Sequence, residues 1–338
     1  MSHPPLVSVV MGVYNGERSL GPTIDSIRSQ TMTDWEFVIV DDASTDSSAK
    51  ILADFAKRDS RIRIFRQSEN QGLTKALIHG CCEARGTYIA RQDNGDYSLK
   101  DRLQKQWIFL EQNSDVVAVG SGIRRIGPKG EFLGDTTREL SPRSVTAMFL
   151  ETGKSIVHAA AMIRRSALED AGGYRCEFRV AQDIDLWYRL SDLGLIAELS
   201  DVLSCISIDL RGISATSNGK QHRLAAIART CHAARRCGMA ESVLLKQAEE
   251  ISCEKTIKTS DSVSERRRRG EPNYFLGSEL FSHRNPGCRA YLVHSIRCRH
   301  RIPQAVAKYF LSFLTCSTEK SCQPSHDATH HGNESPIT

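Results

Sequence analysis

Short apolar runs alternate with longer amphipathic stretches through the first 125 residues of the chain. The apolar runs are rich in β-branched residues and predict buried strands, at residues 7–13, 36–40, 62–65, 87–90 and 116–119. The stretches between them carry apolar residues at helical spacing and predict helices. Strands that alternate with helices form a mostly parallel sheet, with ligands at the carboxyl ends of the strands. We therefore predict an α/β fold with a mostly parallel central sheet flanked by helices.

Beyond residue 125 the pattern is less regular and becomes mostly helical. It predicts helices near 144–150, 166–171 and 183–193 and a strand near 159–163. The segments after residue 217 look helical, and the polar end of the chain predicts a disordered tail. The predicted organisation is one domain at 1–215 with halves at 1–125 and 126–215, a helical C-terminal region at 216–315, and the tail at 316–338.

The composition is that of an ordinary globular protein, with 40% hydrophobic and 25% charged residues among 338. No apolar run reaches the roughly 18 to 20 residues that span a bilayer. The N-terminal residues lack the charged and apolar regions of a signal peptide, so we expect a cytoplasmic location. The 11 cysteines show no C-x-x-C spacing, which favours free thiols over zinc sites or disulfides.

The net charge of +5 comes from the C-terminal region, where basic residues outnumber acidic ones. Basic residues at 266–269 and 289–301 precede an apolar stretch at 309–314. This combination predicts peripheral contact with an anionic membrane, but a solvated face beside a packed helix explains it equally well. Basic motifs interleaved with aromatic residues are absent, so we expect no nucleic acid partner.

Acidic residues stand where the predicted strands end or a later helix begins. Asp41 and Asp42 close the second strand, Asp93 and Asp96 follow the fourth, and Asp183 and Asp185 open a later helix. A doubly wound sheet holds a nucleotide at the carboxyl ends of its strands. One such pair could merely cap the next helix, but three clusters together indicate a binding site.

Five stretches between about residues 6 and 210 are specific as a set because of their order and spacing. They read VSVVMGVYNGERSL, SQTMTDWEFVIVDDASTD, NQGLTKALIHG, ARQDNGDYSLKDRL and GGYRCEFRVAQDIDLWYRL. Together they resemble glycosyltransferase family 2, the inverting enzymes of the GT-A fold. The resemblance implies transfer of a sugar from a nucleotide diphosphate sugar to the hydroxyl of a saccharide or lipid-linked acceptor, in polysaccharide or glycolipid assembly. The Q-x-x-R-W motif of processive synthases is absent, which favours single addition.

The resemblance places the donor at the end of the first strand. There Gly12 offers a small residue and Tyr14 a flat ring that a base can approach. Tyr14 and Asp42 match family positions that contact the base and ribose, and Asp93 is expected near the ribose or diphosphate. A carboxylate suits an imide N–H or a ribose hydroxyl because it only accepts hydrogen bonds. Tyr14 could instead pack on a helix.

The family's DXD motif holds a divalent cation, and this sequence departs from it. The usual Asp-x-Asp-Asp reads Asp93-Asn94-Gly95-Asp96, so a glycine replaces one carboxylate. Asp93 and Asp96 remain as candidate ligands for Mn²⁺ or Mg²⁺, which prefer oxygen ligands. We expect Gly95→Asp to be tolerated and to strengthen metal binding.

Inverting transfer needs a base beside the acceptor hydroxyl. Asp183 matches the family's base, and the helix dipole at its position favours the ionised carboxylate. Asp185 lies roughly 200° further around that helix and points elsewhere. Trp187, one turn after Asp183, is a candidate for lining the acceptor pocket, and His158 for reaching the diphosphate. Packing in the core explains each of these two residues as well.

Two other classes of nucleotide-binding protein do not fit. A dinucleotide-binding oxidoreductase needs G-x-G-x-x-G after the first strand, but Gly12, Gly16 and Gly21 are spaced differently. No G-x-x-x-x-G-K-[ST] P-loop occurs either. One alternative stays open because of Gly95: a catalytically degenerate protein of the same fold that binds a nucleotide sugar without turning it over.

Overall fold

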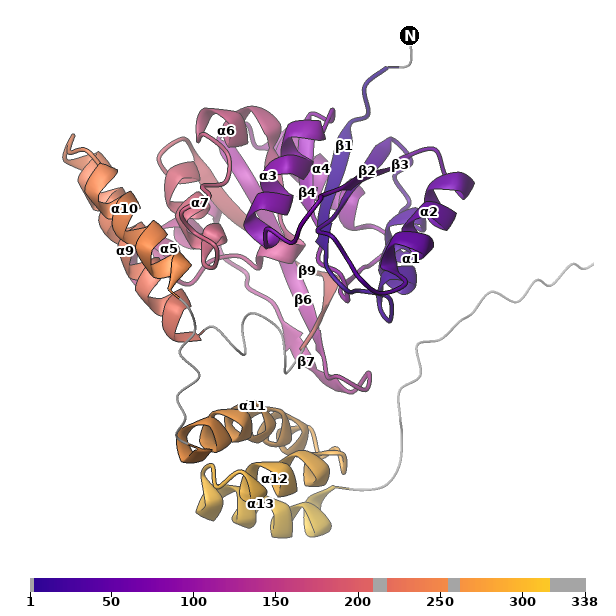
Figure 1. The fold of residues 1–338 in the computed structure, drawn as a ribbon, viewed down its shortest axis with the longest axis vertical. Helices are drawn as coiled ribbons and strands as arrows, with labels where there is room; N and C mark the ends of the chain where they lie inside the picture. The colour runs from indigo at the N-terminus through magenta and orange to yellow at the C-terminus, as the bar shows by residue number, and fades with distance from the viewer. Residues whose placement is uncertain (1–2, 209–217, 255–261, 317–338) are drawn as a thin grey trace, which may run out of the picture.

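The structure is a computed structural model that describes residues 3–208, 218–254 and 262–316, without the side chains of residues 218 and 262–269. The predicted boundary at residue 215 and the tail beyond residue 316 lie outside the described residues, as do the side chains of Arg266 to Arg269. Figure 1 shows an α/β body above a separate group of helices formed by the end of the chain.

Four parallel strands form the first half of the sheet. In spatial order they are β3 (Ile62–Arg66), β2 (Trp35–Asp41), β1 (Val7–Val13) and β4 (Tyr88–Arg91). β2 is buried along its whole length and β1 almost so, because helices cover both faces of the sheet. Within one or two residues at their ends, these strands are the ones that the apolar runs predict.

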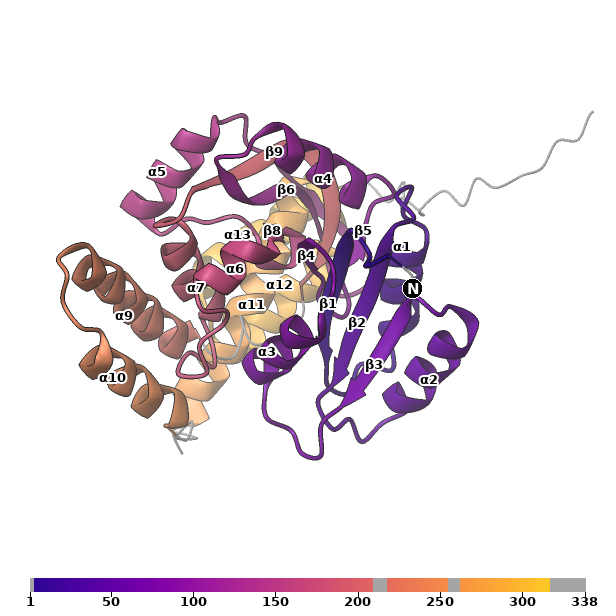
Figure 2. The ribbon, with the colours of Figure 1, turned by 90° about the horizontal axis from the view of Figure 1, so that it is seen from above.

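The connecting helices divide between the two faces of the sheet (Figure 2). They are α1 (Leu20–Arg28), α2 (Ser48–Arg58), α3 (Leu73–Glu83) and α4 (Arg102–Gln112). Leucines and isoleucines of α1, α2 and α4 share one apolar cluster with Val9 and Met11 of β1. Leu77 of α3 packs in a second cluster with Val10, the neighbour of both residues on the strand. The two faces therefore have separate cores, as the alternation of side chains along a strand requires.

The second half of the sheet mixes strand directions. Its strands are β5 (Tyr97–Ser98), β6 (Val116–Ile126), β7 (Phe132–Thr136), β8 (Met162–Arg164) and β9 (Leu195–Ser207). β8 runs antiparallel between β4 and β6, whereas the long β9 runs parallel to β6. The strand expected near 159–163 is instead a 3₁₀ turn (His158–Ala160) followed by β8. The longest ladders remain parallel, so the predicted mostly parallel α/β fold is confirmed.

The remaining helices are α5 (Pro142–Thr152), α6 (Arg165–Asp170), α7 (Gln182–Leu190), α9 (Asn218–Arg236), α10 (Ser242–Cys253), α11 (Ser262–Ser282), α12 (Cys288–Arg297) and α13 (Ile302–Thr315). Those of the predicted C-terminal region, α9 to α13, form two groups. Helices α9 and α10 pack on α5 and α7, in the same apolar cluster as α3. Helices α11 to α13 share a separate cluster with Leu133 of β7. Within the residues described, no helix has the length and apolarity to cross a bilayer.

Candidate active site

Arg91, the last residue of β4, organises the turn that follows it. Its side chain is fully buried, and its Nη1 donates to the backbone oxygens of Val10 at 2.7 Å and Gln92 at 2.9 Å. Its Nε lies 3.3 Å from Nε2 of His158, and its Nη2 forms an ion pair with Asp93. With the guanidinium held from three sides, the Asp93 carboxylate is fixed at the carboxyl end of the strand.

A second buried arginine lies under the same turn. Arg102 of α4 donates from Nη2 to the backbone oxygen of Arg91 at 2.7 Å and from Nη1 to Oγ of Ser98 at 2.8 Å. Burial and the charge of Arg91 lower the pKa of Arg102, but a guanidinium stays charged at neutral pH. Two buried positive charges therefore support the turn, where an anionic ligand would be stabilised.

Asp96 closes this turn and is almost completely buried. Its Oδ1 accepts a hydrogen bond of 2.8 Å from the backbone N–H of Ser207 on β9. Burial, and then the charge of Asp93, raises the pKa of Asp96 to about 8. The carboxyl therefore retains its proton at neutral pH unless another positive charge comes close.

The donor set around the turn fits a divalent cation only in combination with a ligand. The described residues contain no group of three or more His, Cys, Asp or Glu side chains suited to a metal ion. Mg²⁺ commonly binds through one or two carboxylates together with substrate phosphates and water. Asp93 and the easily protonated Asp96 match that pattern, and a cation would draw Asp96 into its ionised form.

Gly95 has a backbone conformation that contradicts one expectation. Its φ angle is +99°, a region that residues with a side chain rarely adopt, although a Cβ there would approach nothing closer than Oγ of Ser19 at 3.8 Å. An aspartate at this position would therefore be strained by its backbone rather than by its neighbours. The backbone conformation of Gly95 argues against the expectation that Gly95→Asp is tolerated.

Tyr14 and Gly12, two residues of the predicted donor site, differ in how accessible they are to a ligand. Tyr14 is 51% exposed, so its ring is not packed on a helix and remains accessible to a ligand. Gly12 faces α3, because a Cβ there would lie 3.1 Å from Cβ of Ala76 and 3.2 Å from Cδ1 of Leu73. Its small size therefore permits the close packing of α3 on β1, and does not leave open space for a base.

Asp42 holds the turn into α3. Its two carboxylate oxygens accept hydrogen bonds of 2.8 Å from the backbone N–H groups of Gln71 and Gly72, and only 3% of the residue is exposed. Each oxygen keeps one further lone pair. A contact between Asp42 and a base or ribose would therefore add to a structural role and would not replace it.

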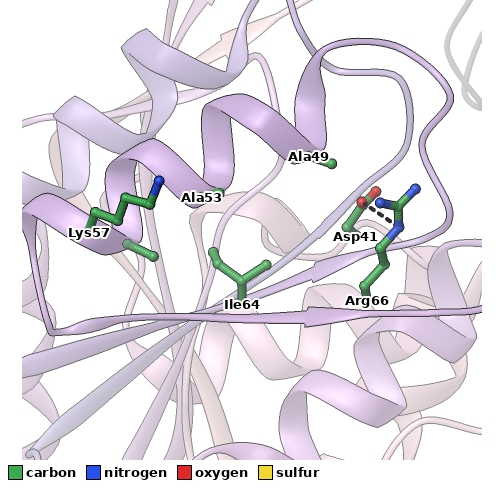
Figure 3. Close-up of a pocket in the computed structure, with 7 residues that line it drawn as sticks. Asp41, Ala49, Ala53, Lys57, Ile64 and Arg66 are labelled. Carbon is green, nitrogen blue, oxygen red and sulfur yellow. Dashed lines mark ion pairs between the residues drawn. The ribbon is translucent and has the colours of Figure 1, made fainter.

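A pocket of about 470 Å³ opens beside Asp41, the neighbour of Asp42 in the sequence (Figure 3). Three alanines of α2, with Lys57, Ile64, Asp41 and Arg66, form its wall. Oδ2 of Asp41 is buried without a hydrogen bond, 3.5 Å from Nε of Arg66. The pocket lies between α2 and β3, and neither Tyr14 nor Asp93 lines it, so it is separate from the predicted donor site.

Asp183 lies in the first turn of α7 and is half-buried. Burial raises the pKa of its carboxyl, the N–H groups of Ile184 and of Asp183 itself oppose this, and the charge of Asp93 raises the pKa further. The two carboxyls, from opposite halves of the domain, are thus within electrostatic reach of each other. Ala181, two residues before Asp183, has a φ of +57°. Backbone strain of this kind occurs often at functional sites.

Asp185 has a different environment. It is buried, and its Oδ2 lies 2.6 Å from Nη2 of Arg189, with Arg175 at 3.5 Å from its other oxygen. The pair with Arg189 lies within α7 and the pair with Arg175 joins α7 to the preceding loop, so the carboxylate of Asp185 is committed to structure.

Trp187, the candidate for the acceptor pocket, and His158, the candidate for reaching the diphosphate, are both closed to a ligand. Trp187 is completely buried in the core shared with α3, so stacking of an acceptor sugar on its ring is not supported. His158 is buried, with Nε2 at 2.6 Å from Oη of Tyr174. Burial, and then the charge of Arg91, lowers the pKa of His158 well below its usual value, which leaves the ring neutral. His158 thus supports Arg91, and through it Asp93, rather than facing a diphosphate.

Sequence reasoning missed the buried residues that arrange the carboxylates. Arg91 and Arg102 are fully buried, and Tyr174 is nearly so. A signal was present for Arg91, because an arginine that ends an otherwise apolar strand must find buried partners. No comparable signal marks Tyr174, whose partner His158 is distant in the sequence.

Known proteins resemble this chain in sequence. The model of glycosyl transferase family 2 matches residues 8–172. The chain is 38% identical over 197 residues to EpsE of Bacillus subtilis (strain 168), a protein assigned as a glycosyltransferase, and the match covers 57% of this chain and 69% of EpsE. It is 31% identical over 186 residues to the O-antigen biosynthesis glycosyltransferase WbnJ of Escherichia coli, covering 55% of this chain and 71% of WbnJ.

Solved structures show the same fold. S. aureus TarS 1-349 in complex with UDP has a TM-score of 0.54 at 16% identity, and the alignment covers 90% of this chain and 91% of that one. The complex of the same protein with UDP-GlcNAc has a TM-score of 0.55 at 15% identity, covering 91% and 89%. The matched domain, the sequence relatives and the shared GT-A architecture lead to one conclusion: this chain is a glycosyltransferase and belongs to glycosyl transferase family 2.

Proposed function

We propose that the protein transfers a sugar from a nucleotide diphosphate sugar to an acceptor hydroxyl with inversion, one sugar at a time, in polysaccharide or glycolipid assembly. The observation that carries the proposal is the placement of two carboxylates: Arg91 holds Asp93 at the carboxyl end of β4, and Asp183 lies half-buried in the first turn of α7. These residues come from the donor and acceptor halves of the domain. The name of WbnJ supports a role in polysaccharide assembly. The TarS complexes with UDP and UDP-GlcNAc support a nucleotide diphosphate sugar as the donor.

The roles follow from position and chemistry. Tyr14 and Asp42 contact the base and ribose of the donor, and Asp93 lies beside the diphosphate. Asp183 accepts the proton of the acceptor hydroxyl as that oxygen attacks the anomeric carbon. The bond between this carbon and the diphosphate oxygen breaks on the opposite face, which inverts the anomeric configuration.

Asp93 and Asp96 would hold a divalent cation, Mn²⁺ or Mg²⁺, on the donor side. When bound, the cation neutralises charge on the departing diphosphate. Arg91 holds the carboxylate of Asp93 and the N–H of Ser207 holds that of Asp96, while the buried Arg91 and Arg102 add positive potential behind them. The proposed location is the cytoplasm, which suits the ten free thiols among the described residues.

The test is a panel of nucleotide sugars carrying UDP and GDP, scored for release of the nucleoside diphosphate with and without saccharide acceptors. We expect one donor to be turned over, and NMR of the product to show the inverted anomer. Retention of configuration would contradict the single displacement.

A second candidate function is binding of a nucleotide sugar without turnover. Gly95 favours it, since it removes one carboxylate, and so does the engagement of Asp93 by Arg91. Calorimetric titration with UDP and GDP beside the product assay separates the two functions. Tight binding without any product, across the whole panel and with both cations, would favour the degenerate protein.

A further inference from the structure

Helix α13 exposes apolar side chains on the face that its neighbours do not cover. Ala305 and Ser312 are buried on its inner face, against the cluster formed with α11 and α12. On the outer side Phe310 is 65% exposed and Leu314 is 83% exposed. Leu311 and Phe313 flank them and are also exposed. A surface helix of a soluble domain normally carries charges there, so this face indicates an interaction site.

The segment that contains α12 and α13 carries one sign of charge. Residues 280–316 contain no aspartate or glutamate. Their basic side chains are Arg284, Arg289, Arg297, Arg299, Arg301 and Lys308. Within the described part of the chain, none of these six forms an ion pair with a carboxylate. Their charge is therefore available to an anionic partner.

One of these cations is held directly beside the apolar face. The guanidinium of Arg289 lies 4.1 Å from the ring centre of Phe313, and its Nε donates to Oγ of Ser312 at 3.1 Å. An aromatic ring next to a fixed positive charge suits the boundary between lipid headgroups and acyl chains.

Helices α11 to α13 lie at the end of the molecule toward which the carboxyl ends of β1 and β4 point. In Figure 1 the chain enters β1 at the top, and α13 lies at the bottom, beyond β7. The carboxyl ends of β1 and β4, with Tyr14 and Asp93, therefore face the end where α13 lies. Ion pairing of Arg125 with Glu279 and a hydrogen bond from Tyr291 to Glu131 attach the helices to the β6–β7 extension.

We propose that the outer face of α13 docks on an anionic phospholipid surface and thereby turns the active site toward a lipid-linked acceptor. The apolar side chains enter the headgroup boundary, and the cations pair with lipid phosphates. A second copy of the chain is a poor occupant because six cations would oppose six others. Nucleic acid is also a poor one, since phosphates offer nothing to four apolar side chains. The acceptor part of this inference rests on the proposed function, whereas the docking part does not.

The test is flotation of the full chain with vesicles of phosphatidylglycerol and phosphatidylethanolamine, beside vesicles of phosphatidylcholine alone. The double variant Phe310→Ser/Leu314→Ser removes the outermost apolar groups. The matched control is Met239→Ser/Val243→Ser, which removes two apolar side chains near the start of α10 that are also more than half exposed. We expect wild type and control to float with the anionic vesicles, and binding of the Phe310/Leu314 variant to fall by about tenfold or more.

Three outcomes would overturn docking: wild type that stays unbound at low salt, equal flotation with neutral vesicles, or normal flotation of the Phe310/Leu314 variant. Circular dichroism melts show whether that variant is folded. The variant Arg297→Ser/Arg299→Ser leaves the apolar face intact, and we expect it to lose flotation with the anionic vesicles at low salt independently. Sugar transfer to a soluble acceptor, measured without vesicles, tests the proposed function separately. Intact sugar transfer by a protein that does not float with the vesicles would reject membrane docking and leave the proposed function standing.

Discussion

Asp183 is the residue on which the proposed chemistry depends most directly. General-base catalysis typically contributes about 10² to 10⁴ in rate. Asp183→Asn keeps the size of the side chain but cannot accept the proton, so turnover should fall by that factor. Nucleotide affinity should stay the same, because the proposed donor contacts lie on other elements. Single-turnover assays and calorimetry measure the two effects.

The control for this variant follows from the structure. Asp185→Asn is unsuitable, since it would leave Arg189 buried beside a weakened partner and lower stability. Asp170→Asn, on the exposed side of α6, is the better match. Near-normal turnover of the Asp183 variant would refute the assignment.

The raised pKa of Asp183 also predicts a pH dependence. The base must be ionised to act, so turnover should decrease as pH falls through the pKa of Asp183. Burial raises that pKa, so this limb should lie above the usual range of about 4 for an aspartate. A profile of kcat against pH, compared with that of Asp183→Asn, measures it. An unchanged acidic limb in the variant would assign the titration to another group.

Gly95 gives a test at the level of the backbone. Gly95→Asp would place a side chain at φ +99° and should destabilise the protein by about 1 kcal/mol or more. Gly21→Asp is the control, since Gly21 lies in the first turn of α1 with no atom within 4 Å of its Cβ position. Urea unfolding compares the two. Equal stability of both variants would show that the turn adapts.

Among the elements, the turn into α3 depends on Asp42. Replacing it with alanine leaves two half-buried N–H groups without their acceptor, at a cost of at most about 1 to 3 kcal/mol each. Asp42→Ala should therefore lower both the unfolding free energy and the affinity for nucleotide. Glu69→Ala, exposed in the same loop, should change neither. A loss of affinity without any loss of stability would mean that the carboxylate serves the ligand alone.

Elements with a clear apolar pattern could be predicted from the sequence, and β9 could not. β1 and β2 are continuous apolar runs, so their pattern identifies them. β9 has a partly exposed stretch around Asp201 and was not predicted, because neither alternation nor a continuous apolar run marks it. Likewise Asp93 and Asp183 stand in motifs, but the support of Asp93 by Arg91 depends in turn on His158, which lies 67 residues from Arg91 in the sequence.

At the scale of the whole molecule, the proposed site lies where the two halves of the domain meet. β4 brings Asp93 and Arg91, β9 fixes Asp96 through Ser207, and α7 brings Asp183. β8 connects the halves because it pairs with β4 on one side and β6 on the other. A ligand that bridges the halves would therefore stabilise the domain as one unit, in proportion to its affinity.

The last prediction concerns the cation that would complete this junction. Asp93 and Asp96 are too few to hold a metal tightly alone, so we expect metal and nucleoside diphosphate to bind cooperatively. EDTA should abolish turnover, and Mn²⁺ or Mg²⁺ should restore it. In thermal melts, UDP or GDP with Mn²⁺ should raise Tm by more than the sum of the separate effects, and Asp96→Asn should remove that excess. Full turnover in EDTA would reject the metal site, whatever the melts show.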